Sequence, residues 1–163
     1  MGETKGVEAM REPHPALQRL NALVGEWEIW ATVGDTPTAG GRSVVEWMEG
    51  GAFLLQRTDA ELPEDAPPEW LANSPFPVSA IIGLDDASEE FTMLYADGRG
   101  VHRVYRMTFA DGVWRIWREA PGFNQRFTGA LSADGASITC SWEMSQDGTS
   151  WQHDFDLEYR RVK

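Results

Sequence analysis

Residues 105–155 read YRMTFADGVWRIWREAPGFNQRFTGALSADGASITCSWEMSQDGTSWQHDF. Asp-Gly and Pro-Gly pairs interrupt this stretch at 111–112, 121–122, 134–135 and 147–148. An Asp-Gly pair between alternating apolar runs is a strong hairpin signal, because both residues tolerate the positive φ of a two-residue turn. The stretch therefore predicts a meander of antiparallel strands, which a further Asp-Gly pair at 97–98 extends toward the N-terminus.

These turns also predict which side chains share one face of the meander, because a tight turn determines which residues lie opposite each other. We expect Arg118 to lie opposite Gln125. We expect Trp142 to lie between Phe127 on one neighbouring strand and His153 on the other. The predicted inner face, mostly apolar, carries the candidate ligand-binding residues Arg103, Tyr105, Trp114, Arg118, Gln125, Phe127, Trp142, Trp151, His153 and Phe155.

The rest of the chain supplies enough further strands to close a barrel. Alternation and turn signals predict ten strands, at about 25–33, 41–48, 52–59, 78–84, 89–96, 101–110, 113–120, 123–133, 136–146 and 149–162. Leu17 and Leu20, followed by Val24 or Leu23, recur at three- and four-residue spacing and predict a short helix over 14–24. Because closure removes the two exposed edges of an open sheet, we expect an all-β, ten-stranded antiparallel barrel. It forms a single domain over 14–163, after a disordered arm over 1–13.

Residues 60–77 differ from the rest of the chain, since they hold five of its nine prolines together with the large apolar residues Trp70 and Phe76. A loop of this length in a compact domain is usually functional or disordered. The Pro67-Pro68 pair favours one helical turn, because proline is well tolerated at the first helical position. We expect this segment to form a flap over one end of the barrel.

Composition narrows the class of partner. The chain has 163 residues and a formal net charge of −12, so it lacks the cationic surface that nucleic acid or an anionic membrane requires. Cys140 is the one cysteine, which excludes an internal disulfide. No apolar stretch is long enough to span a membrane or to resemble a signal peptide, so we expect a cytoplasmic protein. Monomer and homodimer both remain open.

Two polar residues of the predicted inner face carry the functional hypotheses. An inward arginine is costly unless it is paired or hydrated, so Arg118 either binds the anionic or carbonyl end of a ligand or forms an internal pair. Tyr105, Gln125 and Arg103 are expected to assist it. His153, among aromatic residues, is either a hydrogen-bonded core residue, an axial ligand of haem iron, or a general acid or base.

The opening of the first predicted strand, Leu23-Val24-Gly25-Glu26-Trp27, resembles the Gly-x-Trp start of calycin-type barrels, which include lipocalins, fatty-acid-binding proteins and the nitrobindin-like group. The resemblance implies a late arginine packed across Trp27, with Arg161 as the candidate and Arg160 as the alternative. It also implies that His153 matches the haem-ligating histidine that nitrobindins carry on the C-terminal strand.

The whole layout is most similar to a family of uncharacterised bacterial calycin-like barrels. The features that carry this resemblance are the Leu-Val-Gly-x-Trp opening, the turn at Gly50-Gly51, Asp-Gly-x-x-Trp at 147–151, and Tyr-Arg-Arg at 159–161. Together they cover most of residues 14–163.

The function expected first is binding of a small, largely apolar ligand with a polar or anionic end inside the barrel. Trp114, Phe127, Trp142, Trp151 and Phe155 would form the walls of such a site. Haem binding through His153 is the first alternative. A cyclase or isomerase acting inside the barrel is the second, although catalysis is the less favoured interpretation. No protein-only metal site is expected, because no His-x-His or Cys-x-x-Cys spacing occurs.

Overall fold

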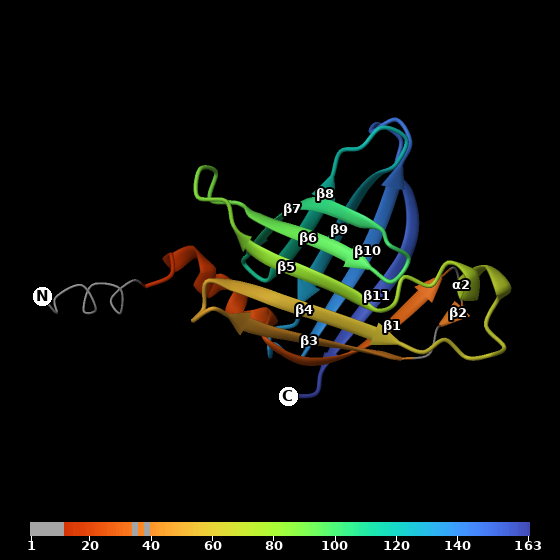
Figure 1. The fold of residues 1–163 in the computed structure, drawn as a ribbon, viewed down its shortest axis with the longest axis horizontal. Helices are drawn as coiled ribbons and strands as arrows, with labels where there is room; N and C mark the ends of the chain where they lie inside the picture. Colours follow the sequence, from red (N-terminus) through yellow and green to blue (C-terminus); the bar gives the residue numbers. More distant parts are fainter. Residues whose placement is uncertain (1–11, 34–35, 38–39) are drawn as a thin grey trace, which may run out of the picture.

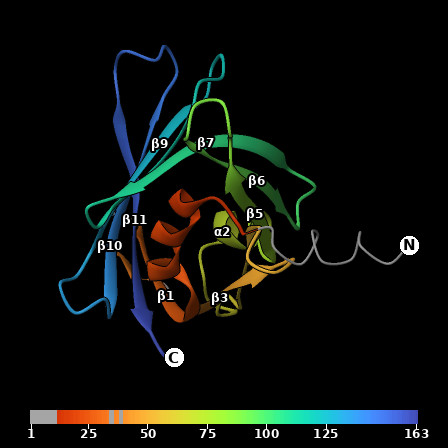
Figure 2. The ribbon, with the colours of Figure 1, turned by 90° about the vertical axis from the view of Figure 1, so that its left-hand side faces the viewer.

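The computed structural model describes residues 12–33, 36–37 and 40–163. Most of the predicted arm over 1–13 therefore lies outside the described residues. Ten antiparallel strands and one two-residue strand form a single sheet, which closes into a barrel where β1 pairs with β11. Figure 1 shows this barrel from the side, and Figure 2 shows it in a view that runs more nearly along the barrel axis. The predicted all-β, ten-stranded barrel is confirmed.

The elements follow one another along the chain with short connections, except between β4 and β5. They are η1 (Pro15–Leu23), β1 (Gly25–Val33), β2 (Thr36–Pro37), β3 (Gly41–Met48), β4 (Phe53–Ala60), α2 (Pro68–Ala72), β5 (Val78–Leu84), β6 (Phe91–Asp97), β7 (His102–Ala110), β8 (Val113–Arg118), β9 (Asn124–Leu131), β10 (Ser137–Ser145) and β11 (Gln152–Arg161). From β3 to β11 each strand pairs with its neighbours in sequence.

The predicted N-terminal helix is a 3-10 helix, η1, which closes one end of the barrel. Pro15 occupies its first turn, and the His14 Nδ1 atom accepts the backbone N–H of Ala16 at 3.0 Å. Leu17, Leu20 and Leu23 are buried against the strands. In Figure 2 the helix lies inside the ring of strands, so its apolar side completes the core at this end.

The predicted register holds across the three hairpins that join β7, β8, β9 and β10. Arg118 lies opposite Gln125, and Phe127 lies opposite Trp142. At the β7–β8 turn both Asp111 and Gly112 have positive φ, 54° and 75°, as a two-residue turn of this kind requires. These hairpins therefore place the predicted residues on the inner face.

The register predicted for the last hairpin is wrong. Trp142 lies opposite Phe155 instead of His153, and Glu143 lies opposite His153, so Asp154 is the extra residue of a β-bulge. The connection spans residues 146–151 because the Asp147 carboxylate accepts the backbone N–H groups of Thr149 and Ser150, each at 2.8 Å. This capped loop replaces the expected two-residue turn, and the bulge places His153 on the outer face.

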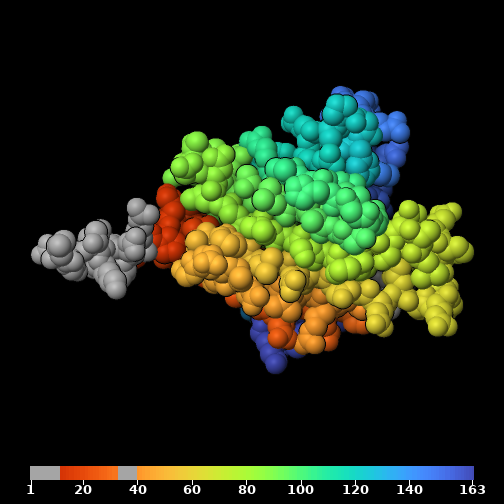
Figure 3. Space-filling view, viewed as in Figure 1, coloured from red at the N-terminus to blue at the C-terminus, as the bar shows by residue number. Residues whose placement is uncertain are grey.

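The proline-rich segment lies at the end of the barrel opposite η1. Its predicted helical turn is α2, which Figure 1 places beyond the ends of β1 and β4 and Figure 2 places behind η1. The Gly98 N–H donates to the carbonyls of Pro75 and Pro77 at 2.9 Å, which ties the segment to the β6–β7 turn. Figure 3 shows β3 to β7 as a continuous wall from which this segment projects.

Among the described residues, no helix combines the length and the apolar character needed to cross a membrane.

Candidate functional site

Arg161 and Trp27 organise the closed end of the barrel. The Arg161 guanidinium lies 4.1 Å from the centre of the Trp27 ring. It donates to the carbonyls of Val24 at 2.6 Å, Ala22 at 2.8 Å and Gly135 at 3.0 Å. The expectation from the resemblance is therefore confirmed for Arg161, whereas Arg160 lies over Trp30 on the outer face. Each of these side-chain hydrogen bonds joins the last strand to backbone at the closed end of the barrel.

The centre of the barrel is packed. Trp114 and Phe127 are almost fully buried, with ring centres 4.9 Å apart. The void beside Trp114 measures about 10 Å³, which admits one water molecule but no metabolite. Gly129 shows how tight the interior is, since a Cβ atom there would lie 3.1 Å from Ile138 Cγ2. Trp114 and Phe127 were predicted as walls of a ligand pocket, but the structure places them in the core.

The inner face opens at the other end of the barrel, which we call the mouth. The inner-face residues at the mouth are Arg103, Tyr105, Arg118, Gln125, Trp142, Met144 and Phe155. Tyr105 and Gln125 are buried, and the Tyr105 hydroxyl donates to Gln125 Oε1 at 2.8 Å. Trp142, Met144 and Phe155 are only half-buried, although their side chains belong to the inner face. The mouth therefore exposes apolar surface inside the barrel.

Arg118 is half-buried at the end of β8, opposite Gln125. No hydrogen bond or ion pair joins its guanidinium to any other residue that the structure describes. Arg118 and Gln125 border a pocket of about 440 Å³ at the rim of the barrel. Its other lining residues are Trp117, Glu119, Asn124, Arg126, Asp147, Gly148 and Trp151, and of these Trp117 and Arg126 belong to the outer face. This volume falls within the range of small-molecule sites.

Arg103 is the second half-buried arginine of the mouth. Its guanidinium lies 5.3 Å from the ring centre of Phe123, on the turn between β8 and β9. Phe123 itself is 37% exposed, so this contact is at the rim. The sequence correctly predicts that Arg103 and Arg118 share the mouth, although their side chains meet different neighbours.

A buried carboxylate supports the rim, and the sequence did not reveal it. The Asp97 carboxylate accepts hydrogen bonds from the Tyr95 hydroxyl at 2.7 Å and from Arg99 Nη2 at 2.7 Å. Burial opposes ionisation of Asp97, but these bonds outweigh it and hold the pKa of the carboxyl well below its ordinary value. Burial in turn raises the pKa of Tyr95. The alternation along β6 places Tyr95 and Asp97 on the same face. The turn that follows Asp97 is longer than two residues, so the sequence did not predict how β6 aligns with β7.

His153 and Trp151 were both predicted to face inward, but they lie on the outer side of the barrel, where Trp151 lines the pocket beside Arg118. His153 Nε2 is 2.7 Å from the Asp156 carboxylate, and the histidine side chain is 52% exposed. Trp151 packs under Arg126, whose guanidinium lies 4.1 Å from the ring centre and also binds Glu143. An axial haem ligand needs an apolar pocket wide enough for a porphyrin, whereas charged side chains surround His153. These residues do not fit a haem.

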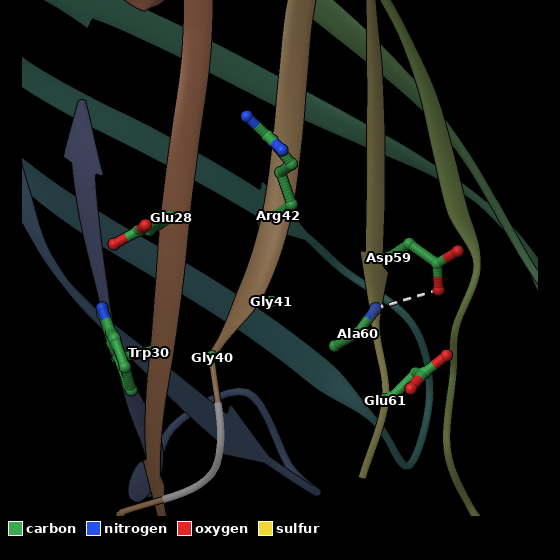
Figure 4. A pocket seen from close by; sticks show the side chains of 8 residues that line it. All are labelled: Glu28, Trp30, Gly40, Gly41, Arg42, Asp59, Ala60 and Glu61. Carbon is green, nitrogen blue, oxygen red and sulfur yellow. Dashed lines mark hydrogen bonds between the residues drawn. The ribbon is translucent and has the colours of Figure 1, made fainter. Parts of the chain in front are cut away.

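A second pocket lies on the outer wall, away from all predicted site residues. It measures about 590 Å³ and crosses β1, β3 and the end of β4. Figure 4 shows Glu28 and Trp30 on one side, Asp59 and Glu61 on the other, and Gly40 and Gly41 between them. The Asp59 carboxylate already accepts the Ala60 N–H at 2.9 Å. The pocket is a shallow acidic cleft that nothing in the sequence indicated.

No family model matches the sequence, and no curated protein matches it. A crystal structure of Rv2717c from M. tuberculosis superposes with a TM-score of 0.57 and 16% identity, covering 93% of this chain and 100% of that one. A DUF3598-family protein of unknown function from Nostoc punctiforme covers 91% of this chain and all of its own at 9% identity, with a TM-score of 0.28. At 16% identity the likeness to Rv2717c supports the barrel fold alone.

Proposed function

We propose that the protein binds a small, largely apolar ligand whose polar end is a hydrogen-bond acceptor, with the polar end at Arg118. The single observation that carries the proposal is a half-buried arginine without a partner among the described residues, lining a pocket of about 440 Å³. Desolvating a guanidinium costs several kcal/mol unless an acceptor compensates it.

The environment of the other arginines supports this role. Arg19, Arg57 and Arg115 also have no ion pair among the described residues, but they are exposed, and the half-buried Arg103 packs on Phe123. Ion pairs with carboxylates neutralise Arg42, Arg99, Arg106, Arg126 and Arg160. In a chain of net charge −12, acidic partners are abundant, so an inner-face arginine left unpaired is unusual. A planar guanidinium suits a carboxylate, because it donates two parallel hydrogen bonds to it.

The apolar part of the ligand would lie against Trp117 and Trp151, the half-buried aromatic side chains that line the pocket. Burying this surface on binding would contribute about 25 cal/mol per Å². Met144 lies opposite Gln125, and Trp142, two residues before it on β10, stacks on Phe155 with ring centres 6.5 Å apart. These inner side chains adjoin the pocket's Gln125 but do not line the pocket themselves. Because the core below Trp142 is packed, the site is shallow. The packing of Arg161 across Trp27 also supports a place for the chain among calycin-like barrels.

Calorimetric titration with 1-naphthoate and its neutral amide, 1-naphthamide, tests the proposal. Substitution Arg118→Met removes a charge-assisted hydrogen bond, so we expect 1-naphthoate to bind about tenfold more weakly. The amide should lose about threefold or less, because it has no charge to pair. Arg115→Met, on the outer face of the same strand, is the matched control and should change neither affinity.

Equal losses for the two compounds in Arg118→Met would contradict the role of Arg118. Failure of the wild-type protein to bind 1-naphthoate would overturn the proposed function itself.

A further inference from the structure

The hydrogen bond between Tyr105 and Gln125 determines which end of the Gln125 side-chain amide faces the pocket. Tyr105 is 2% exposed, and its hydroxyl donates to Gln125 Oε1 at 2.8 Å. No other acceptor for this hydroxyl occurs among the residues that the structure describes. Because a buried hydroxyl rarely leaves its proton unpaired, the tyrosine holds the amide oxygen inward.

The nitrogen of the Gln125 side-chain amide then points away from Tyr105 and is available to the pocket. Within the described part of the chain, Trp114 Nε1 is the one fully buried side-chain donor or acceptor without a partner. Gln125 Nε2 has no hydrogen-bond partner there either, so it must retain solvent contact, and Gln125 lines the pocket with Arg118. Side by side, the pocket therefore presents two groups that only donate, an amide NH₂ and a guanidinium. The carboxylates of Glu119 and Asp147 also line it, but Asp147 Oδ1 already accepts the Ser145 hydroxyl and the N–H groups of Thr149 and Ser150.

The tyrosine is held in place by its neighbours. Its ring makes edge contacts with Tyr95 at 6.0 Å and with Trp142 at 5.9 Å between ring centres. The hydroxyl of Tyr105 is thus preorganised, and the orientation of Gln125 follows from it.

We propose that Tyr105 is a positioning residue that makes the mouth selective for an acceptor-only group, a carboxylate, over an isosteric group that must donate. The inference rests on the proposed function, since it describes how the same site chooses its ligand. A site built to use a hydrogen-bonding group strongly rejects the analogue that leaves a buried polar group unpaired.

The test is the ratio of the affinities for 1-naphthoate and 1-naphthamide in Tyr105→Phe. The wild-type protein should prefer the carboxylate about tenfold or more, because the amide NH₂ meets a donor. Without the hydroxyl, the Gln125 amide is free to rotate and offer its oxygen. We expect the preference to fall to about threefold or less, with the amide binding more tightly than in the wild type.

Two further variants separate positioning from structural damage. Tyr95→Phe removes a neighbouring hydroxyl that binds Asp97, and it should leave the ratio unchanged even if stability falls. Gln125→Glu keeps an acceptor for Tyr105 but replaces the donor with an oxygen, so 1-naphthoate should bind at least about tenfold more weakly.

The outcomes distinguish the two proposals. An unchanged ratio in Tyr105→Phe, with the Arg118→Met loss intact, would overturn the positioning role and leave the proposed function standing. A change of the ratio in Tyr95→Phe as large as in Tyr105→Phe would also overturn it. Absence of 1-naphthoate binding by the wild-type protein would remove the proposed function and this inference together.

Discussion

The two ends of the barrel treat an inward arginine in opposite ways. At the closed end Arg161 packs on Trp27 and donates to three backbone carbonyls. At the mouth Arg118 is equally part of the inner face, yet no described residue accepts a hydrogen bond from it. The first arginine is fully used by the fold, and the second has no hydrogen-bond partner among the described residues.

This difference predicts separate roles for the two arginines of one sheet, Arg161 in stability and Arg118 in the proposed binding. A satisfied guanidinium contributes to stability, because its hydrogen bonds are already made. An unsatisfied one contributes little to the fold and is kept at a cost in desolvation. Removing each arginine should therefore produce opposite patterns in unfolding and in binding experiments.

The largest effect is expected at the closed end. Arg161→Met leaves three carbonyls without their donor and should lower the free energy of unfolding by about 2–4 kcal/mol. Arg118→Met should change it by less than about 0.5 kcal/mol, because no internal bond is lost. Urea denaturation of both variants measures the difference. Similar destabilisation by the two substitutions would contradict the expected difference between Arg161 and Arg118.

Asp97 extends the comparison to the rim of the mouth, where a buried carboxylate is fully paired. Its lowered pKa means that its stabilising contribution is present above the ordinary carboxyl pKa of about 4 and is lost as the pH falls below it. Asp97→Asn should cost about 1–3 kcal/mol at pH 7 and weaken the acid dependence. Unfolding curves between pH 7 and pH 2 report both, and an unchanged acid slope in the variant would argue against this assignment.

His153 provides the smallest expected effect. Its bond to the Asp156 carboxylate lies on the outer surface, with both side chains more than half exposed. Such pairs contribute little, so His153→Ala should alter the free energy of unfolding by less than about 0.5 kcal/mol. It should also leave the affinity for 1-naphthoate unchanged. A marked loss of affinity would return His153 to the site, against its outward position.

The sequence predicted the fold and three of the four hairpin registers, because alternation and turn residues act locally. It failed at the last hairpin because an Asp-Gly pair does not distinguish a two-residue turn from a loop capped by Asp147. The bulge at Asp154 then turned His153 outward. For Trp114 and Phe127, the register predicts only that they face inward. Whether they line a pocket or fill the core depends on how tightly the whole barrel packs around Gly129.

The most direct test of the account observes the two arginines at once. The Nε–H signals of Arg118 and Arg161 can be followed by ¹⁵N-resolved NMR during titration with 1-naphthoate and assigned by Arg118→Lys. We predict that the Arg118 signal shifts on addition of the carboxylate while the Arg161 signal stays in place. A shift of Arg161, or no shift of Arg118 on binding, would contradict the claim that the mouth arginine is the one reserved for a ligand.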